Sequence, residues 1–369
     1  MDAAGNQLPY IDRIVSTIVD PEVYQLKIMS GEADMAIMNT SFENYPLYKE
    51  SEEQGGYKVT LVAGRNGSEV PYFLNQNHPD PVLREIFQDI RFRRALSLAI
   101  NRDEINESVF FGVAVPRQAT LHSGATFYKP EWGEEHPYAR YDPAAAQELL
   151  DEMGLTERDA DGFRLRPDGK TALLIIEYPT SMSSTSVTVH ELVKEYWEDI
   201  GLKVLLKPGE YALTFERMEA GETEILSETE IFRKELREYN ISPETIRWGS
   251  KWHVWLEAEQ AIEDGRQKLD EFEGGKLPGE EPPQKIKDLF ALLVQRYSSE
   301  YGSQEYLEVS EKIFDFYAEE LPIIGTVGLA PSVYTANANL GNTIKGDYTI
   351  PGSPGGVAVT LGKFLFFRN

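Results

Sequence analysis

The chain has 369 residues, which is long for a single core, so we expect two domains or lobes. Its 61 Asp and Glu residues outnumber its 36 Lys and Arg residues, which gives a formal net charge of −25. This charge repels polyanions, so nucleic acid and anionic membrane surfaces are excluded as partners. Cysteine is absent, which excludes thiol catalysis, thiolate metal sites and disulfides.

The first third of the chain alternates between expected strands and helices, as is typical of an α/β fold. Alternating apolar residues predict a strand at residues 11–16. Asp20-Pro21 predicts the start of a helix and Gly31 its end. Further extended segments are expected at residues 33–38, 57–61 and 70–74.

Residues 86–111 carry the clearest helical pattern. Apolar residues recur at helical spacing up to Ile100, and Asn101 then begins a second helix with Glu104 at the capping-box position. We therefore expect two helices that meet at a tight corner.

The middle of the chain continues the alternation of helices and strands. Asp142-Pro143 predicts the start of a helix that ends at Gly154. The remaining elements are a hairpin turn at 166–170 between segments 163–166 and 173–178, a helix at 189–200, a strand at 203–207 and a helix at 211–220.

The last third reads differently, because long acidic helical stretches are expected between residues 222 and 301. Residues 271–283, rich in Gly, Glu and Pro, predict a loop. A final helix is expected from about residue 304 to Pro322, followed by an apolar strand at 323–329.

Catalytic and metal-binding patterns are missing from the sequence. The five histidines never form a His-x-x-x-His or His-x-His pair, and neither Gly-x-Ser-x-Gly nor a phosphate-binding glycine pattern occurs. Asp159-x-Asp161-Gly162 resembles the start of a calcium loop but lacks the later ligands, so a turn beside the hairpin is the preferred interpretation. No catalytic residue, metal or cofactor is predicted.

Trp248, Trp252 and Trp255 follow one another at positions i, i+4 and i+7, and so share one helix face. Such a stripe is more often core than ligand platform, but it is the best pointer in the sequence to a binding wall. In a ligand wall the rings would be partly exposed at a cleft between lobes, and neighbouring Arg247 could meet a carboxylate.

Five blocks, in the same order, closely resemble family 5 of the bacterial extracellular solute-binding proteins, the oligopeptide and dipeptide receptors of ABC importers. The longest is DIRFRRALSLAINRDE at residues 89–104. The others are SGEAD at 30–34, PYFLN at 71–75, YDPAAA with two leucines at 141–150, and WEDIGLKV at 197–204. Residues 317–328 are similar to a long-chain subgroup.

The resemblance implies an α/β, periplasmic-binding-protein-like two-lobed clamshell of the class with mixed sheets, one lobe complete and the other partial. It implies a substrate-binding component that captures a peptide or similar oligomeric solute, delivers it to an ABC permease in the membrane, and works in the periplasm or outside the cell at its surface. Tyr72 and Asn75, on the strand that resembles the family's Tyr-x-x-x-Asn block, join Arg247 and the three tryptophans as candidate ligand-binding residues.

The resemblance covers only the second half of family members, so the N-terminal half of the same receptor, with its signal peptide, is expected as a missing partner. Residues 1–58 and 326–369 are assigned to the partial lobe I, and residues 59–325 to lobe II. Peptide-binding family members have a Trp-rich segment whose aspartate holds the peptide's amino terminus. Here residues 222–240 are acidic and helix-like, and no ligand residue is carried over to them.

Three alternatives stay open on sequence alone. The chain could be a carbohydrate-active hydrolase that uses paired carboxylates, because 61 acidic residues always offer some pair at a suitable distance. It could be an oligosaccharide-binding receptor. It could also be a former transport receptor that now serves as an interaction module.

Overall fold

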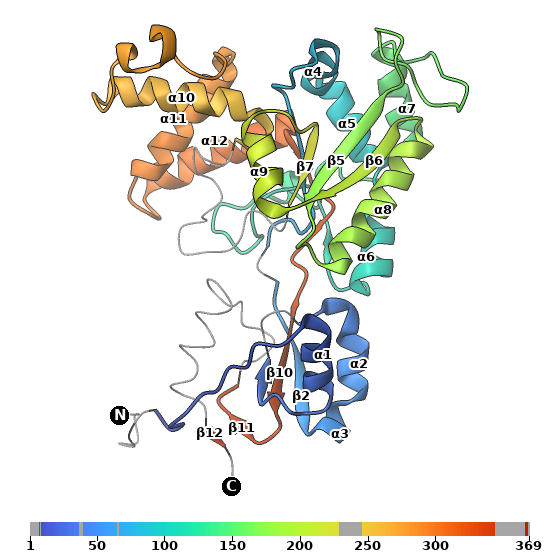
Figure 1. Ribbon diagram of the computed structural model, residues 1–369, viewed down its shortest axis with the longest axis vertical. Coiled ribbons are helices and arrows are strands. Elements are labelled where there is room, and N and C mark those ends of the chain that lie inside the picture. Colours follow the sequence, from blue (N-terminus) through green and yellow to red (C-terminus); the bar gives the residue numbers. More distant parts are fainter. Residues whose placement is uncertain are drawn as a thin grey trace. The chain divides into compact units, whose positions relative to one another are not determined.

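The computed structural model describes residues 7, 9–36, 40–64, 66–228, 246–343 and 366–367. The chain forms two compact units (Figure 1). Unit 1 contains Met1–Arg65, Val109–Ala114 and Leu329–Asn369, and unit 2 contains Asn66–Ser108 and Val115–Gly328. Parts of three predictions lie outside the described residues, namely the end of the strand at 33–38, most of the acidic segment 222–240, and much of 326–369.

Unit 2 is built on a mixed five-stranded sheet with the strand order β6-β5-β7-β3-β8. β5 runs parallel to β6 and β7, whereas β3 runs antiparallel to β7 and β8. A parallel pair requires a crossover, which the helix between β5 and β6 provides. The strands are β3 (Tyr72–Leu74), β5 (Leu173–Pro179), β6 (Lys203–Gly209), β7 (Ile225–Ser227) and β8 (Ile323–Ile324), and a separate pair joins β4 (Val115–Pro116) to β9 (Val327–Gly328).

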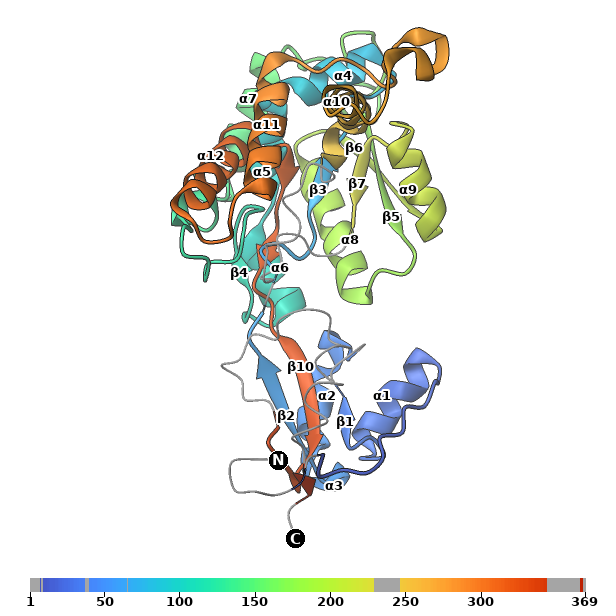
Figure 2. The same cartoon turned by 90° about the vertical axis from the view of Figure 1, so that its left-hand side faces the viewer.

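Helices surround this sheet, with α8 packed against β6 and α9 against β5 (Figure 2). α11 and α12 pack on each other and contribute to the largest core of the unit. The helices that begin in unit 2 are α4 (Pro81–Gln88), α5 (Ile90–Ala99), α6 (Arg102–Phe110), α7 (Pro143–Glu152), α8 (Ser184–Asp199), α9 (Tyr211–Glu219), α10 (Ser250–Glu263), α11 (Gln284–Ser298) and α12 (Gln304–Glu320).

Side-chain caps start several of these helices where the sequence predicts them. Asp142 accepts a hydrogen bond from Ala145 N at 3.0 Å at the start of α7. Before α6, Asn101 Oδ1 accepts from Glu104 N at 3.2 Å, and its amide donates to the Glu104 carboxylate at 3.1 Å. These caps satisfy backbone donors that the first turn of a helix leaves unpaired, so the predicted boundaries are confirmed.

Two buried arginines of the block at residues 89–104 bind the segment that follows α12, at residues 320–325. Arg93 donates from Nε to the carbonyl of Glu320 at 2.7 Å, and its Nη2 lies 3.2 Å from the Glu320 carboxylate. Arg102 donates from Nη2 to the carbonyl of Gly325 at 2.8 Å. Burial lowers the pKa of Arg93 to about 10 and that of Arg102 to about 9, but both remain cations at neutral pH. These contacts therefore bind helices α5 and α6 to the segment that follows α12.

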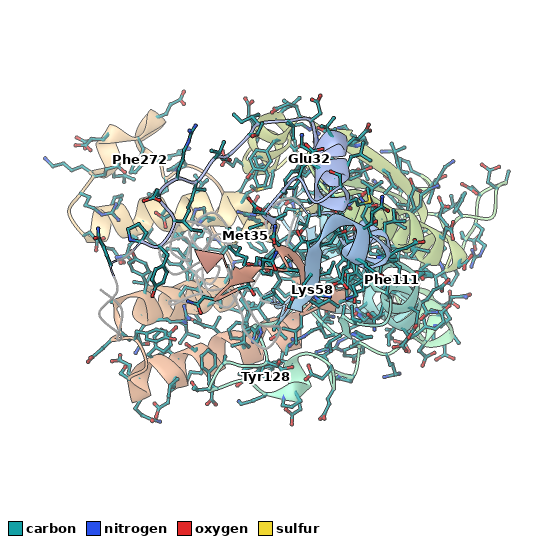
Figure 3. The ribbon with its side chains drawn as sticks, turned by 90° about the horizontal axis from the view of Figure 1, so that it is seen from below. Glu32, Met35, Lys58, Phe111, Tyr128 and Phe272 are labelled. Atoms are coloured by element: carbon teal, nitrogen blue, oxygen red, sulfur yellow. The ribbon has the colours of Figure 1, made fainter. Side chains whose placement is uncertain are left out.

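Unit 1 contains a three-stranded antiparallel sheet in the order β1-β10-β2, whose outer strands carry Met35 and Lys58 (Figure 3). One face is covered by a small core around Ile28, Tyr48 and Val333. Its elements are α1 (Pro21–Met29), β1 (Met35–Ala36), α2 (Tyr45–Glu50), α3 (Glu52–Gly55), β2 (Tyr57–Val62) and β10 (Ser332–Asn337), with β11 (Leu340–Gly341) paired to β12 (Phe366–Phe367).

The predicted strand at residues 11–16 is wrong, because this segment pairs with no strand among the described residues and runs as coil to α1 (Figure 1). Alternation describes the side chains, but a strand also needs a neighbour for its backbone groups. The hairpin is only partly right. The turn closes through a hydrogen bond from Arg166 N to Lys170 O at 2.7 Å, but β5 pairs in parallel with β6 and β7.

The mixed α/β architecture expected from the sequence is confirmed. Asp159 is confirmed as a turn residue, because Oδ1 accepts from Asp161 N and Phe163 N, each at 3.0 Å, and Oδ2 accepts from the Thr171 hydroxyl at 2.6 Å. Among the described residues, no group of three or more acidic, His or Cys side chains could hold a metal ion. No helix in the described part of the chain is long and apolar enough to cross a membrane.

Candidate ligand-binding surface

The first two predicted site residues, Tyr72 and Asn75, lie on and just after β3 and are buried. The Tyr72 hydroxyl lies 2.9 Å from His190 Nδ1. Burial raises the pKa of Tyr72 and lowers that of His190 to about 3, so both are neutral at pH 7. Asn75 Nδ2 donates to the carbonyls of Gly221 and Thr223 at 2.9 and 2.7 Å, which fixes the turn between α9 and β7. Tyr72 thus joins β3 to α8, and Asn75 joins the end of β3 to the turn before β7.

Trp248 and Trp252 lie in the core of unit 2, with 1% and 3% of their surface exposed. The two rings meet edge to face with centroids 6.2 Å apart. The Trp252 indole N–H donates to the Asn77 amide oxygen at 2.7 Å, so its one polar group is satisfied inside the protein. The expectation of partly exposed rings is therefore wrong for these two. The two rings share one core with apolar side chains of α11 and α12, and Phe316 of α12 stacks on Trp248 with ring centroids 6.4 Å apart.

Trp255 is only partly buried on the outer side of the same core. The ammonium group of Lys287 lies 4.4 Å from the centroid of its ring, a cation–π contact. A ligand contact by Trp255 stays a prediction.

Arg247 is the predicted site residue that keeps a partly exposed charged group, and its guanidinium contacts two other side chains. It begins the single-turn helix Arg247–Gly249, which is bound to the segment after β3 by a hydrogen bond from Gln76 N to Trp248 O at 2.8 Å. Its guanidinium forms an ion pair with Glu228, directly after β7. The same group lies 5.2 Å from the ring centroid of Phe215 on α9.

Phe215 in turn packs against Tyr211, one helical turn earlier, with ring centroids 4.6 Å apart and the ring planes tilted by 35°. More than half of the Tyr211 surface is exposed. We call Arg247, Glu228, Phe215 and Tyr211 the Arg247 cluster. Burial lowers the pKa of Arg247, while Tyr211 and Glu219 act in the opposite direction. The guanidinium remains protonated at any physiological pH.

The Arg247 cluster can make two kinds of contact with a solute. The exposed Tyr211 ring offers a face on which an apolar side chain or a sugar ring can stack. The guanidinium presents N–H donors to an acceptor, and Glu228 accepts from a donor. None of the four residues of the Arg247 cluster lines the pocket that the structure shows in unit 2. That pocket, about 390 Å³ in volume, is lined by Arg102, Glu134, His136, Arg140 and Tyr141 among others.

Sequence reasoning missed three members of this cluster. Tyr211 and Phe215 stand four residues apart in a helix that was predicted, and this aromatic spacing was a usable signal. Glu228 had none, because the three-residue strand before it is too short to give a periodic pattern.

Comparison with known proteins identifies the family. The sequence model for bacterial extracellular solute-binding proteins, family 5 middle, matches residues 4–228. This chain belongs to that family. The family consists of binding proteins and not of enzymes, so the hydrolase alternative is removed.

Three relatives show the extent of the similarity. A solved oligopeptide-binding protein OppA is 34% identical, with a TM-score of 0.76 over 99% of this chain and 58% of its own. The periplasmic alpha-galactoside-binding protein of Rhizobium meliloti is 27% identical over 223 residues, 56% of this chain and 31% of that protein. The periplasmic binding protein MelB of Agrobacterium fabrum, solved with stachyose, has a TM-score of 0.71 at 17% identity and supports the fold alone. The chain thus spans little more than half of these solved relatives and about a third of that curated one.

Proposed function

We propose that this chain is part of the substrate-binding component of an ABC importer, which captures a peptide or similar oligomeric solute and delivers it to a membrane permease. The single observation that carries the proposal is the family match over residues 4–228. A receptor of this kind acts in the periplasm or at the cell surface. The two compact units are proposed to correspond to its two lobes, and the lobe boundaries at residues 58/59 and 325/326 stay a prediction.

A peptide is the first candidate solute. The relative named as an oligopeptide-binding protein is 34% identical and matches 99% of this chain. The Arg247 cluster supports this choice, because a peptide offers carbonyl and carboxylate acceptors for Arg247 and apolar side chains for the Tyr211 ring.

An oligosaccharide is the second candidate, favoured by the adjacent rings of Tyr211 and Phe215. Aromatic faces pack against the apolar faces of sugar rings, and the paired charges of Arg247 and Glu228 suit hydroxyl groups, which both donate and accept. Relatives named for alpha-galactoside binding and for stachyose support this candidate.

Isothermal titration calorimetry of the chain with tripeptide to pentapeptide mixtures and with stachyose tests the proposal. We expect weak binding of one class, with a Kd near about 1 mM, because one unit buries only part of a ligand's surface. Arg247→Ala is expected to weaken this binding about tenfold, and Arg247→Lys less, since a lysine keeps the charge but loses the planar donor fork.

Arg266→Ala is the matched control, because Arg266 is an exposed arginine that pairs with Asp264 away from the cluster. It should leave the affinity unchanged. Binding of neither class, by the chain or by a version extended to the full length of the relatives, would refute the proposed function. Equal losses in both alanine variants would remove the Arg247 cluster from the site.

A further inference from the structure

The pocket of unit 2 is formed by several elements that lie apart in the sequence. Its volume of about 390 Å³ is within the range of small-molecule sites. The first turn of α6 and Pro116 of β4 form part of its wall. The rest comes from residues 134–137 and from residues 139–141, which lead into α7. The pocket therefore belongs to the folded surface of unit 2, and the functional groups on its wall decide what it can hold.

The two arginines of the pocket have few donors left for a ligand. Arg140 donates from Nη1 to the carbonyl of Pro137 at 2.7 Å, and its Nε and Nη2 each lie 3.4 Å from Asp142 Oδ2. Arg102 is buried, and its three nitrogens donate over 2.8 to 3.1 Å to the carbonyls of Ser97, Ala139 and Gly325 and to the hydroxyl of Ser97. An anion is held by free donors, so the pocket suits an anion poorly.

His136 adds no charge to the pocket. Its Nδ1 accepts a hydrogen bond from Tyr138 N at 3.2 Å, so Nε2 carries the hydrogen and donates to the carbonyl of Ala318 at 3.0 Å. Burial lowers the pKa of His136, so the ring is neutral at pH 7. Both ring nitrogens are therefore bound within the protein.

Two carboxylates on the wall are still available. Asp103 and Glu135 are exposed, and within the described residues neither carboxylate accepts a hydrogen bond or forms a salt bridge. Glu134 differs, because it accepts from the Tyr128 hydroxyl and lies 3.6 Å from Arg117 Nη2. The groups that the pocket offers to a ligand are thus mainly acceptors that carry negative charge.

An aromatic ring and two prolines give the same pocket an apolar side. Tyr141 lines it with 47% of its surface exposed, and Pro116 and Pro137 line it as well. The face of an aromatic ring attracts a cation and also packs against a hydrocarbon stem. The net charge of −25 adds a long-range attraction for cations.

We propose that this pocket is a second binding site, which takes a small organic amine in its ammonium form. The ammonium N–H groups donate to Asp103 and Glu135, and the carbon stem packs on Tyr141. A bare metal ion fits less well, because no group of three or more acidic, His or Cys side chains in the described ranges could hold one. The inference goes beyond the proposed function and does not rest on it, since the Arg247 cluster takes no part in the pocket.

Amide NMR spectra of the 15N-labelled chain, titrated with 1,4-diaminobutane, test the proposal. The signals of residues 103, 135 and 141 should shift to saturation with a Kd of about 1 mM. Asp103→Asn with Glu135→Gln should weaken binding about tenfold, and Tyr141→Ala about threefold. The matched control is Asp270→Asn with Glu273→Gln, two exposed acids after α10 with the same change of charge, and it should leave the Kd unchanged.

Two probes separate specific binding from general attraction to an acidic protein. Sodium chloride at the same ionic strength and 1,4-butanediol, which has the same stem without charge, should both leave these signals in place. Shifts that follow ionic strength alone, equal shifts with the diol, equal losses in the two double variants, or tighter binding of Mg²⁺ at the same residues would each overturn the proposal.

Melting curves guard against a variant that does not fold. The diamine should raise the melting temperature of the parent and of the control variant, and raise that of the Asp103/Glu135 variant less. If that variant does not fold, Tyr141→Phe and Tyr141→Ala decide the question, because the phenylalanine keeps the ring and should keep the affinity. Equal affinity of the parent and Tyr141→Ala would then overturn the proposal. Solute binding, measured separately, should be the same in the Asp103/Glu135 variant and the parent, so the two proposals fail independently.

Discussion

Replacing Trp252 with alanine tests whether this tryptophan serves the core of unit 2 or a ligand wall. The ring is 97% covered and its N–H is bound to Asn77 at 2.7 Å. Truncating a buried tryptophan costs about 3 to 5 kcal/mol, and leaving the Asn77 oxygen without its donor adds about 1 kcal/mol or more. The total is comparable with the whole stability of a marginal domain, about 5 kcal/mol. We therefore expect Trp252→Ala to unfold at much lower urea concentration or not to fold.

Two further variants separate the contribution of apolar packing from that of the hydrogen bond to Asn77. Trp252→Phe keeps most of the apolar volume and loses the hydrogen bond, so it should cost about 1 to 3 kcal/mol. Trp255→Ala removes a partly exposed ring and should cost less than Trp252→Ala. Urea unfolding is followed by far-ultraviolet circular dichroism, since the substitutions change tryptophan emission. A Trp252→Ala protein within about 1 kcal/mol of the parent, with weakened solute binding, would refute the core assignment and return the ring to a ligand wall.

Four further predictions follow from particular residues and charges. Because the pKa of buried His190 is about 3, the unfolded state gains a proton below about pH 6.5 and the folded state does not. The contribution of His190 to stability should therefore be constant above that pH and fall as pH drops toward 3, so the melting temperature of His190→Gln should decline less than that of the parent over this range. With a net charge of −25, the melting temperature should rise between about 0.1 and 1 M salt, and a fall would show that surface ion pairs outweigh repulsion. Asn101→Ala should cost about 1 kcal/mol in urea unfolding by removing the acceptor for Glu104 N, and an unchanged midpoint would deny the cap a role. A version of the chain extended to the length of its relatives should bind solute at least about tenfold more tightly in calorimetry, whereas equal affinity would place the whole site within these residues.

The sequence predicts elements whose signals are local. α8 and β6 follow from apolar periodicity and the glycine between them, and α7 from its Asp-Pro cap. Elements that depend on distant neighbours are different. Residues 11–16 have the pattern of a strand but no partner strand in the described part of the chain. β7 has almost no pattern and still pairs with both β5 and β3.

In the candidate site, too, some residues carry a local signal in the sequence and others are brought together only by the fold. The tryptophan spacing drew attention to Arg247, but the spacing itself arises from core packing, since two of the three rings are buried. The partners of Arg247 come from α9 and the end of β7, which only the sheet brings together. A site assembled from several elements leaves little trace in any one of them.

The block that most clearly carries the family resemblance explains why membership does not name the solute. Arg93 and Arg102 donate to carbonyls at Glu320 and Gly325, where the chain leaves α12 and enters β8 and beyond. A buried guanidinium is costly unless its donors are satisfied, so these contacts require the helix pair and the returning chain to be present together. The requirement is one of architecture and places no condition on the solute. Relatives named for oligopeptides and for alpha-galactosides can therefore share the fold, and the search for the solute turns to surfaces such as the Arg247 cluster.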